Sequence, residues 1–115
     1  MQLVIAENIG FCFGVERAID IARRQCEEHG TVYTYGELIH NSDVIRGLKD
    51  EGIVPAETVA EIPGGSTVII RSHGVGPAEI KECAERGLNA VDATCPFVKR
   101  IHQIVSEYRE KGYSI

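Results

Sequence analysis

The stretch Thr67-Val68-Ile69-Ile70-Arg71-Ser72-His73-Gly74-Val75-Gly76-Pro77 decides the fold of this chain. Its β-branched first part, Thr67–Arg71, is the clearest buried strand in the sequence. Gly76-Pro77 then begins a helix, because proline is favoured at the first helical position, and Gly87 ends it. The inner face of this helix is expected to consist of Ile80, Cys83 and Ala84. The stretch therefore predicts a strand, a loop that carries a histidine, and a helix.

The same alternation continues on both sides of this stretch. The other expected strands are Gln2–Ala6, Thr31–Leu38, Ile53-Val54 (ended by Pro55) and Leu88–Ala93. Between them, apolar residues recur three and four apart, and glycines follow each set. The expected helices are one that carries Val15, Ala18, Ile19, Ala22 and Cys26 before Gly30, and one that Asn41-Ser42 caps before Gly52. Strands separated by helices pair in parallel, so we expect an α/β fold with a small, mostly parallel sheet flanked by helices.

A last helix is expected to begin at Pro96 and to end at Gly112. Its buried side is expected to consist of Phe97, Val98, Ile101, Ile104, Val105 and Tyr108. Tyr113-Ser114-Ile115 then resembles the start of another strand. We therefore expect the chain to be a piece of a longer protein.

Composition and charge exclude several classes of protein. The 115 residues are 43% hydrophobic and 25% charged, which is typical of one globular domain and not of a disordered segment. A net charge of −5 argues against a nucleic-acid binder. No apolar run approaches the roughly 20 residues that cross a bilayer, and the N-terminus lacks the pattern of a signal peptide. We therefore expect a cytoplasmic protein without membrane partners, in which cysteines are thiols or metal ligands.

Four residues that can bind metals or anions lie at strand-to-helix junctions of the predicted fold. They are Cys12, His40, His73 and Cys95. In a parallel sheet all such junctions fall on the carboxyl edge, where ligands bind and where helix N-termini present unpaired N–H groups. Two thiolates and two imidazoles at one edge are suited to a metal centre beside an anionic substrate.

Each of these residues also has a purely structural interpretation. Cys12 and Cys95 could be small buried residues, and His40 or His73 alone could be a capping or hydrogen-bonded histidine. We assign that structural role to Cys26 and Cys83, whose neighbours on their helices are apolar. His29 complements a helix C-terminus, and His102 lies beside the apolar stripe of the last helix.

Four motifs of the chain resemble the LytB family, the hydroxymethylbutenyl diphosphate reductases of the methylerythritol phosphate route to isoprenoids. The motifs are Gly10-Phe11-Cys12-Phe13-Gly14-Val15-Glu16-Arg17-Ala18, Ile39-His40-Asn41, Arg71-Ser72-His73-Gly74-Val75 and Asp92-Ala93-Thr94-Cys95-Pro96-Phe97-Val98. The resemblance implies a cytosolic oxidoreductase that converts a branched allylic alcohol diphosphate into isopentenyl and dimethylallyl diphosphates. It implies a 4Fe-4S cluster held by three cysteines, with Cys12 and Cys95 as two of them. It also implies that His40 and His73 bind the diphosphate, and that a ferredoxin or flavodoxin donates electrons.

The resemblance also implies that the chain is incomplete. Family members are more than twice as long and comprise three related α/β units. By this comparison residues 1–12 form an N-terminal strand that pairs with the absent third unit, residues 13–95 the first unit, and residues 96–115 the opening helix and first strand residues of the second. The third cluster cysteine, a glutamate linked to proton delivery and part of the diphosphate site have no counterpart here. We therefore assign no catalytic residue in this chain and expect it to be inactive alone.

Two other functions are compatible with the same residues. The first is a standalone domain that binds zinc through Cys12, Cys95, His40 and His73, since two sulfurs and two nitrogens suit tetrahedral zinc. The second is an anion-binding module that uses helix N-termini and no metal.

Overall fold

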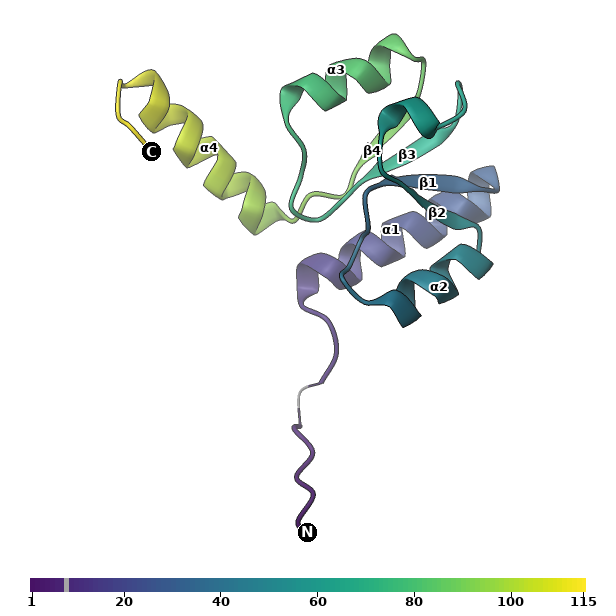
Figure 1. Ribbon diagram of the computed structural model, residues 1–115. Coiled ribbons are helices and arrows are strands. Elements are labelled where there is room, and N and C mark those ends of the chain that lie inside the picture. Colours follow the sequence, from purple (N-terminus) through teal and green to yellow (C-terminus); the bar gives the residue numbers. More distant parts are fainter. Residues whose placement is uncertain (8) are drawn as a thin grey trace.

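The computed structural model describes residues 1–7 and 9–115. These form a sheet of four parallel strands in the order β2-β1-β3-β4 (Figure 1). The strands are β1 (Val32–Tyr35), β2 (Ile53–Ala56), β3 (Thr67–Ile70) and β4 (Asn89–Asp92). The helices are α1 (Phe13–His29), α2 (Ser42–Asp50), α3 (Pro77–Glu85) and α4 (Pro96–Glu110), with a 3-10 helix η1 (Val59–Glu61). The predicted α/β class with a small parallel sheet is confirmed.

The helices cover the two faces of the sheet separately. α1 and α2 lie together on one face, and α3 lies on the opposite face (Figure 1). The first face is filled by the buried residues Ala18, Ile19, Ala22, Val32, Leu38, Leu48, Ile53, Ile69 and Ala93. The second is filled by Ala56, Val59, Ile62, Val68, Cys83 and Leu88. All residues of β3 are buried, because this strand lies between two others and is covered on both faces.

The direction in which the chain crosses the sheet reverses between β1 and β3. From β1 the chain continues through α2 to β2 on one side, whereas from β3 it continues through α3 to β4 on the other. The two strands are direct neighbours, with Tyr33 opposite Val68 and Thr34 opposite Ile69. In open parallel sheets, ligands bind outside the carboxyl ends of the strands at such a reversal. This edge is therefore where a binding site is expected.

Local sequence signals place the helix ends as expected. The Asn41 side chain caps α2 by accepting hydrogen bonds from the N–H groups of Asp43 and Val44, at 3.1 and 3.2 Å. Proline occupies the first turn of both α3 and α4. Gly30 ends α1 with a φ of 78°, a conformation that glycine adopts without the steric cost of a Cβ.

The strand expected over Gln2–Ala6 is not present in the described structure. Leu3, Val4 and Ile5 are 80%, 80% and 71% exposed, and no sheet residue pairs with this segment. A strand needs a neighbour for its N–H and C=O groups, so an apolar stretch with none in the chain does not form one. Tyr113-Ser114-Ile115 likewise forms no strand, and the Tyr113 ring packs edge-on against Tyr108.

Pro55 does not end its strand as predicted. β2 continues through Pro55, which lies opposite Thr34, to Ala56. β2 is at the edge of the sheet and has a hydrogen-bonded neighbour on one side only. Proline, which has no N–H to donate, is tolerated in such a strand.

The inner faces expected for the last two helices are largely exposed. On α3, Cys83 is buried, but Ile80 is 52% exposed and Ala84 is also exposed. On α4 no residue is buried, and Phe97 and Ile101 are 72% and 58% exposed. The reason is that α4 projects away from the sheet instead of lying across it (Figure 1). Within the described ranges, no helix is long and apolar enough to cross a membrane.

Candidate functional site

The structure places three of the four predicted site residues at strand-to-helix junctions on the carboxyl edge, whereas Cys12 lies at the start of α1, which no strand precedes among the described residues. Cys12 is the N-cap residue of α1, and Cys95 is the N-cap residue of α4. His40 lies in the loop between β1 and α2, and His73 lies in the loop between β3 and α3. Neither cysteine uses its side chain to cap its helix; Cys12 is exposed, whereas Cys95 is buried.

The first turn of α1 packs directly against Cys95. A Cβ atom added to Gly14 would lie 2.9 Å from both Cβ and Sγ of Cys95, so only a residue without a side chain allows this approach. Arg17 Nη1 donates a hydrogen bond of 3.3 Å to the carbonyl of Thr94. The rings of Phe13 and Phe97 meet edge-on, with centroids 6.3 Å apart. The two cysteine-bearing helix N-termini are therefore neighbours.

The backbone of Cys95 is tied to the loop that carries His73. The Cys95 N–H donates to the carbonyl of Ser72 at 2.8 Å. Just before it, the N–H of Thr94 donates to Asp92 Oδ1 at 2.9 Å, and Lys99 Nζ lies 2.6 Å from Asp92 Oδ2. Burial alone would raise the pKa of Asp92, but the hydrogen bonds from Lys99 and Thr94 outweigh it and hold this pKa below its ordinary value. The turn into Cys95 is thus fixed on both sides.

His73 and His40 lie in the same part of the edge as Arg71, whose guanidinium is always positively charged. The pKa of His73 is lowered first by partial burial and then by the nearby charges of Arg71 and His40. His40 is 86% exposed in its side chain, and its Nδ1 lies 3.5 Å from Glu37 Oε2. Both imidazoles can therefore reach a ligand at the edge.

His102 lies closer to the site than its predicted structural role suggests. A Cβ added to Gly74 would lie 3.0 Å from His102 Cε1, which places this ring against the turn after His73. His73, Gly74 and His102 line one open pocket of about 670 Å³ between α3 and α4. The sequence held a signal for this, because His102 follows Cys95 by about two helical turns and so lies on the same side of α4.

Arg71 was not singled out as a site residue from the sequence. It directly follows β3 at the carboxyl edge, and its Cζ lies 5.8 Å from the centroid of the Tyr35 ring. Its Nε atom is buried and has no hydrogen-bond acceptor among the described residues. The available signal was a charged residue at the end of a fully buried, uncharged strand.

The donor set fits two corners of a metal cluster but not a complete metal site. Within residues 1–7 and 9–115, no three His, Cys, Asp or Glu side chains come together as metal ligands would. Cys12, Cys95, His40 and His73 therefore do not form the tetrahedral set that the zinc alternative requires. The thiols of Cys12 and Cys95, at adjacent helix N-termini, match the ligand type of iron–sulfur clusters.

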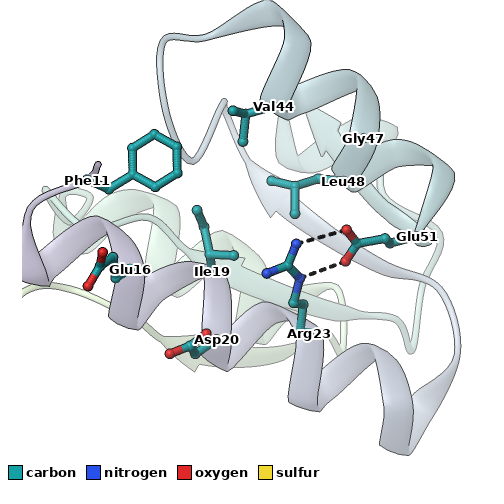
Figure 2. A pocket seen from close by; sticks show the side chains of 9 residues that line it. All are labelled: Phe11, Glu16, Ile19, Asp20, Arg23, Val44, Gly47, Leu48 and Glu51. Carbon is teal, nitrogen blue, oxygen red and sulfur yellow. Dashed lines mark hydrogen bonds and ion pairs between the residues drawn. The ribbon is translucent and has the colours of Figure 1, made fainter. Parts of the chain in front are cut away.

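A second pocket lies between α1 and α2, and Phe11, the neighbour of Cys12 in the sequence, is among the residues that line it. It has a volume of about 490 Å³ and includes the apolar side chains of Ile19, Val44 and Leu48 (Figure 2). Arg23 lies beside these side chains and donates two hydrogen bonds, of 2.7 and 2.9 Å, to the Glu51 carboxylate. None of the four predicted site residues lines this pocket.

The chain is thus a parallel α/β unit that carries two cysteines and two histidines at the carboxyl edge of its sheet. The family model described as LytB protein matches residues 3–115. The chain therefore belongs to the LytB family, as its motifs predicted.

Two relatives of the chain have the same name. The 4-hydroxy-3-methylbut-2-enyl diphosphate reductases of Geobacter sp. (strain M21) and Alkaliphilus oremlandii are 42% and 47% identical to it. The matches cover all of this chain and 41% and 42% of the two relatives, so the chain spans about two fifths of their length.

Two solved structures resemble the chain. One is described as (E)-4-hydroxy-3-methyl-but-2-enyl diphosphate reductase, the terminal enzyme of the non-mevalonate pathway. It has a TM-score of 0.82 and 44% identity over 96% of this chain and 40% of its own. The other is the corresponding reductase from Plasmodium falciparum, with a TM-score of 0.84 and 30% identity over 93% of this chain and 34% of its own.

Proposed function

We propose that this chain forms the N-terminal part of a reductase that acts on 4-hydroxy-3-methylbut-2-enyl diphosphate. The reaction replaces the allylic hydroxyl by hydrogen: two electrons and two protons enter, and one water leaves, giving isopentenyl and dimethylallyl diphosphates. The observation that carries this proposal is the placement of Cys12 and Cys95 at adjacent helix N-termini, with Cys95 hydrogen-bonded through Ser72 to the loop of His73.

Cys12 and Cys95 would hold two corners of a 4Fe-4S cluster, and a third cysteine would come from outside this chain. Two features support this role: Gly14 leaves room for the Cys95 sulfur, and both cysteines are the N-cap residues of their helices. When bound, such a cluster supplies one-electron transfer and Lewis acidity. The electrons would come from a ferredoxin or flavodoxin type of donor.

His40 and His73 would bind the diphosphate of the substrate. Protonated imidazoles donate strong, charge-assisted hydrogen bonds to phosphate oxygens. The positive charges of Arg71 and His40 act against protonation of His73 in the free chain. A bound diphosphate would remove that repulsion, so ligand binding and protonation of His73 would support each other. We further propose that residues 1–12, 13–95 and 96–115 serve as the N-terminal strand, first unit and start of the second unit of a cytoplasmic enzyme.

The cluster proposal is tested in a full-length LytB protein that carries this chain at its N-terminus. After anaerobic reconstitution with iron and sulfide, Cys12→Ser and Cys95→Ser should each abolish the visible absorbance of the cluster. Cys26→Ser is the matched control, because the Cys26 thiol donates to the Glu51 carbonyl at 3.2 Å and a serine hydroxyl can replace it. Unchanged absorbance in both test variants, or tight zinc without sulfide, would contradict the proposal.

The same protein separates the roles of the cysteines and the histidines. His40→Ala and His73→Ala should keep the cluster absorbance and raise the KM for the diphosphate substrate. Unchanged kinetics in His73→Ala would remove that residue from the site. The 115-residue chain alone should not turn the substrate over, since it supplies two of the three cluster cysteines.

A further inference from the structure

Arg71 has the environment of a binding residue rather than of a structural one. It lies at the carboxyl end of β3, beside the end of β1, where the chain's crossing direction reverses. Its Nε atom is buried without an acceptor, and none of the ion pairs among the described residues includes it. A buried guanidinium N–H without an acceptor is costly, and an oxygen-bearing ligand would satisfy it.

The end of β1 fixes the position of this guanidinium. The Tyr35 ring lies under it, in the geometry of a cation–π contact. Gly36 approaches it so closely that a Cβ at this position would collide with Nη1 and would lie 3.3 Å from Cζ. Gly36 also has a φ of 71°, which disfavours any side chain there. The arginine is therefore oriented before any ligand arrives.

Positive charge collects around Arg71 although the chain carries a net charge of −5. The charges of Arg71 and His40 both act on His73. Glu37 pairs with His40, and no ion pair among the described residues joins a carboxylate to His73. Arg71 and the two imidazoles, with one partly exposed carboxylate beside them, form an arrangement that favours a multiply charged anion.

We infer that Arg71 is a further anion-binding residue, which donates hydrogen bonds to phosphate oxygens of the diphosphate at this edge, with Tyr35 and Gly36 orienting it. The inference rests on the proposed function for the identity of the ligand. The planar guanidinium offers paired N–H donors that fit a phosphate, and its charge does not depend on pH. Arg71 thus complements the imidazoles, whose charge does.

Calorimetric titration of the 115-residue chain with inorganic pyrophosphate tests this inference. Arg71→Met should weaken binding by about tenfold or more, and Arg71→Lys should weaken it less, because lysine keeps the charge and loses the fork. Arg109→Met is the matched control: it removes the same charge from the last turn of α4, about 20 Å along the helix from Cys95, and should leave affinity unchanged.

Two further variants test the orientation of the guanidinium while keeping Arg71. Gly36→Ala should weaken pyrophosphate binding because its Cβ displaces the guanidinium, whereas Tyr35→Phe should retain it because the ring remains. Thermal unfolding shows whether each variant is folded. If Arg71→Met is unfolded, the pyrophosphate affinities of Gly36→Ala and Arg71→Lys test the inference instead.

The outcomes separate this inference from the function on which it rests. If His73→Ala weakens binding while Arg71→Met and Arg71→Lys do not, Arg71 has no role in binding and the diphosphate site stands. If the unaltered chain binds no pyrophosphate at millimolar concentration, the inference is overturned, whereas the diphosphate site is overturned only if His40→Ala and His73→Ala also leave the KM of the full-length protein unchanged.

Discussion

Two regions of this molecule, the packed unit from α1 to β4 and the projecting helix α4, have similar apolar patterns, but only the packed unit buries its apolar residues. In the packed unit formed by α1 to β4, the apolar residues of α1 and β3 close against each other, and Ile69 is fully buried. On α4 the same helical spacing produces an apolar stripe in which Ile101 is 58% exposed. Periodicity therefore specifies which face of a helix or strand is apolar, whereas the burial of that face depends on whether the chain contains a segment that packs against it.

The largest expected difference in stability between the two regions comes from replacing one isoleucine in each. Ile69→Ala removes buried methyl and methylene groups from the central strand, so we expect it to lower the free energy of unfolding by about 2–5 kcal/mol. Ile101→Ala removes the same atoms from an exposed stripe and should change it by less than about 0.5 kcal/mol. Urea unfolding of the 115-residue chain measures both. Equal losses would show that α4 is packed in solution.

The sequence predicted the fold well where an element packs against other parts of this chain, and poorly where it does not. Thr67–Arg71 was predicted within one residue of the observed ends of β3, and the stop of α1 at Gly30 was predicted correctly, because the burial partners of both elements lie within the chain. Gln2–Ala6 and the inner face of α4 were predicted wrongly, since their patterns imply neighbours that the chain does not supply. Pro55 was misjudged because its effect depends on strand order, which local sequence does not reveal.

The candidate site was predictable in its position and not in its contacts. The shared carboxyl ends of parallel strands placed His40, His73 and Cys95 at one edge. Cys12 follows no strand and lies at the N-terminus of α1, whose first turn packs against Cys95. The hydrogen bond from Cys95 to Ser72 and the closeness of Arg71 to Gly36 depend on how loops fold against each other. Such contacts join residues far apart in sequence, and no spacing rule encodes them.

Replacing a glycine in α1 or in α2 by alanine should change the stability of the chain by intermediate amounts and in opposite directions. Gly14→Ala should destabilise the chain by about 1–3 kcal/mol, because its Cβ would lie 2.9 Å from Cys95 Sγ in a closed contact. Gly47→Ala, on α2, meets no atom within 4 Å and should stabilise the chain by about 0.5–1 kcal/mol through helix propensity. Thermal unfolding measures both. A stabilising Gly14→Ala would contradict the close packing of α1 against Cys95.

The smallest expected effect concerns the ion pair that joins the two regions, between Asp92 after the packed strand and Lys99 on α4. The pKa of Asp92 is held below its ordinary 3.8, so its carboxylate contributes stability at neutral pH that is lost as the pH falls through the lowered pKa. Both side chains are about half exposed, which keeps the contribution below about 1 kcal/mol.

Asp92→Asn isolates this contribution, because the amide oxygen can still accept the hydrogen bond from the Thr94 N–H while the charge is gone. The variant should be less stable than the unaltered chain at pH 7, and the difference should shrink below pH 3.8 as Asp92 protonates in the unaltered chain. Lys99→Met should produce a similar loss at pH 7, and the loss should decrease with added salt. Urea titrations at pH 7 and pH 3 measure the difference. A difference that is constant with pH would mean that Asp92 acts only through its hydrogen bond to Thr94, and α4 would then be held to the packed unit by the contacts of Gly14, Phe13 and Arg17.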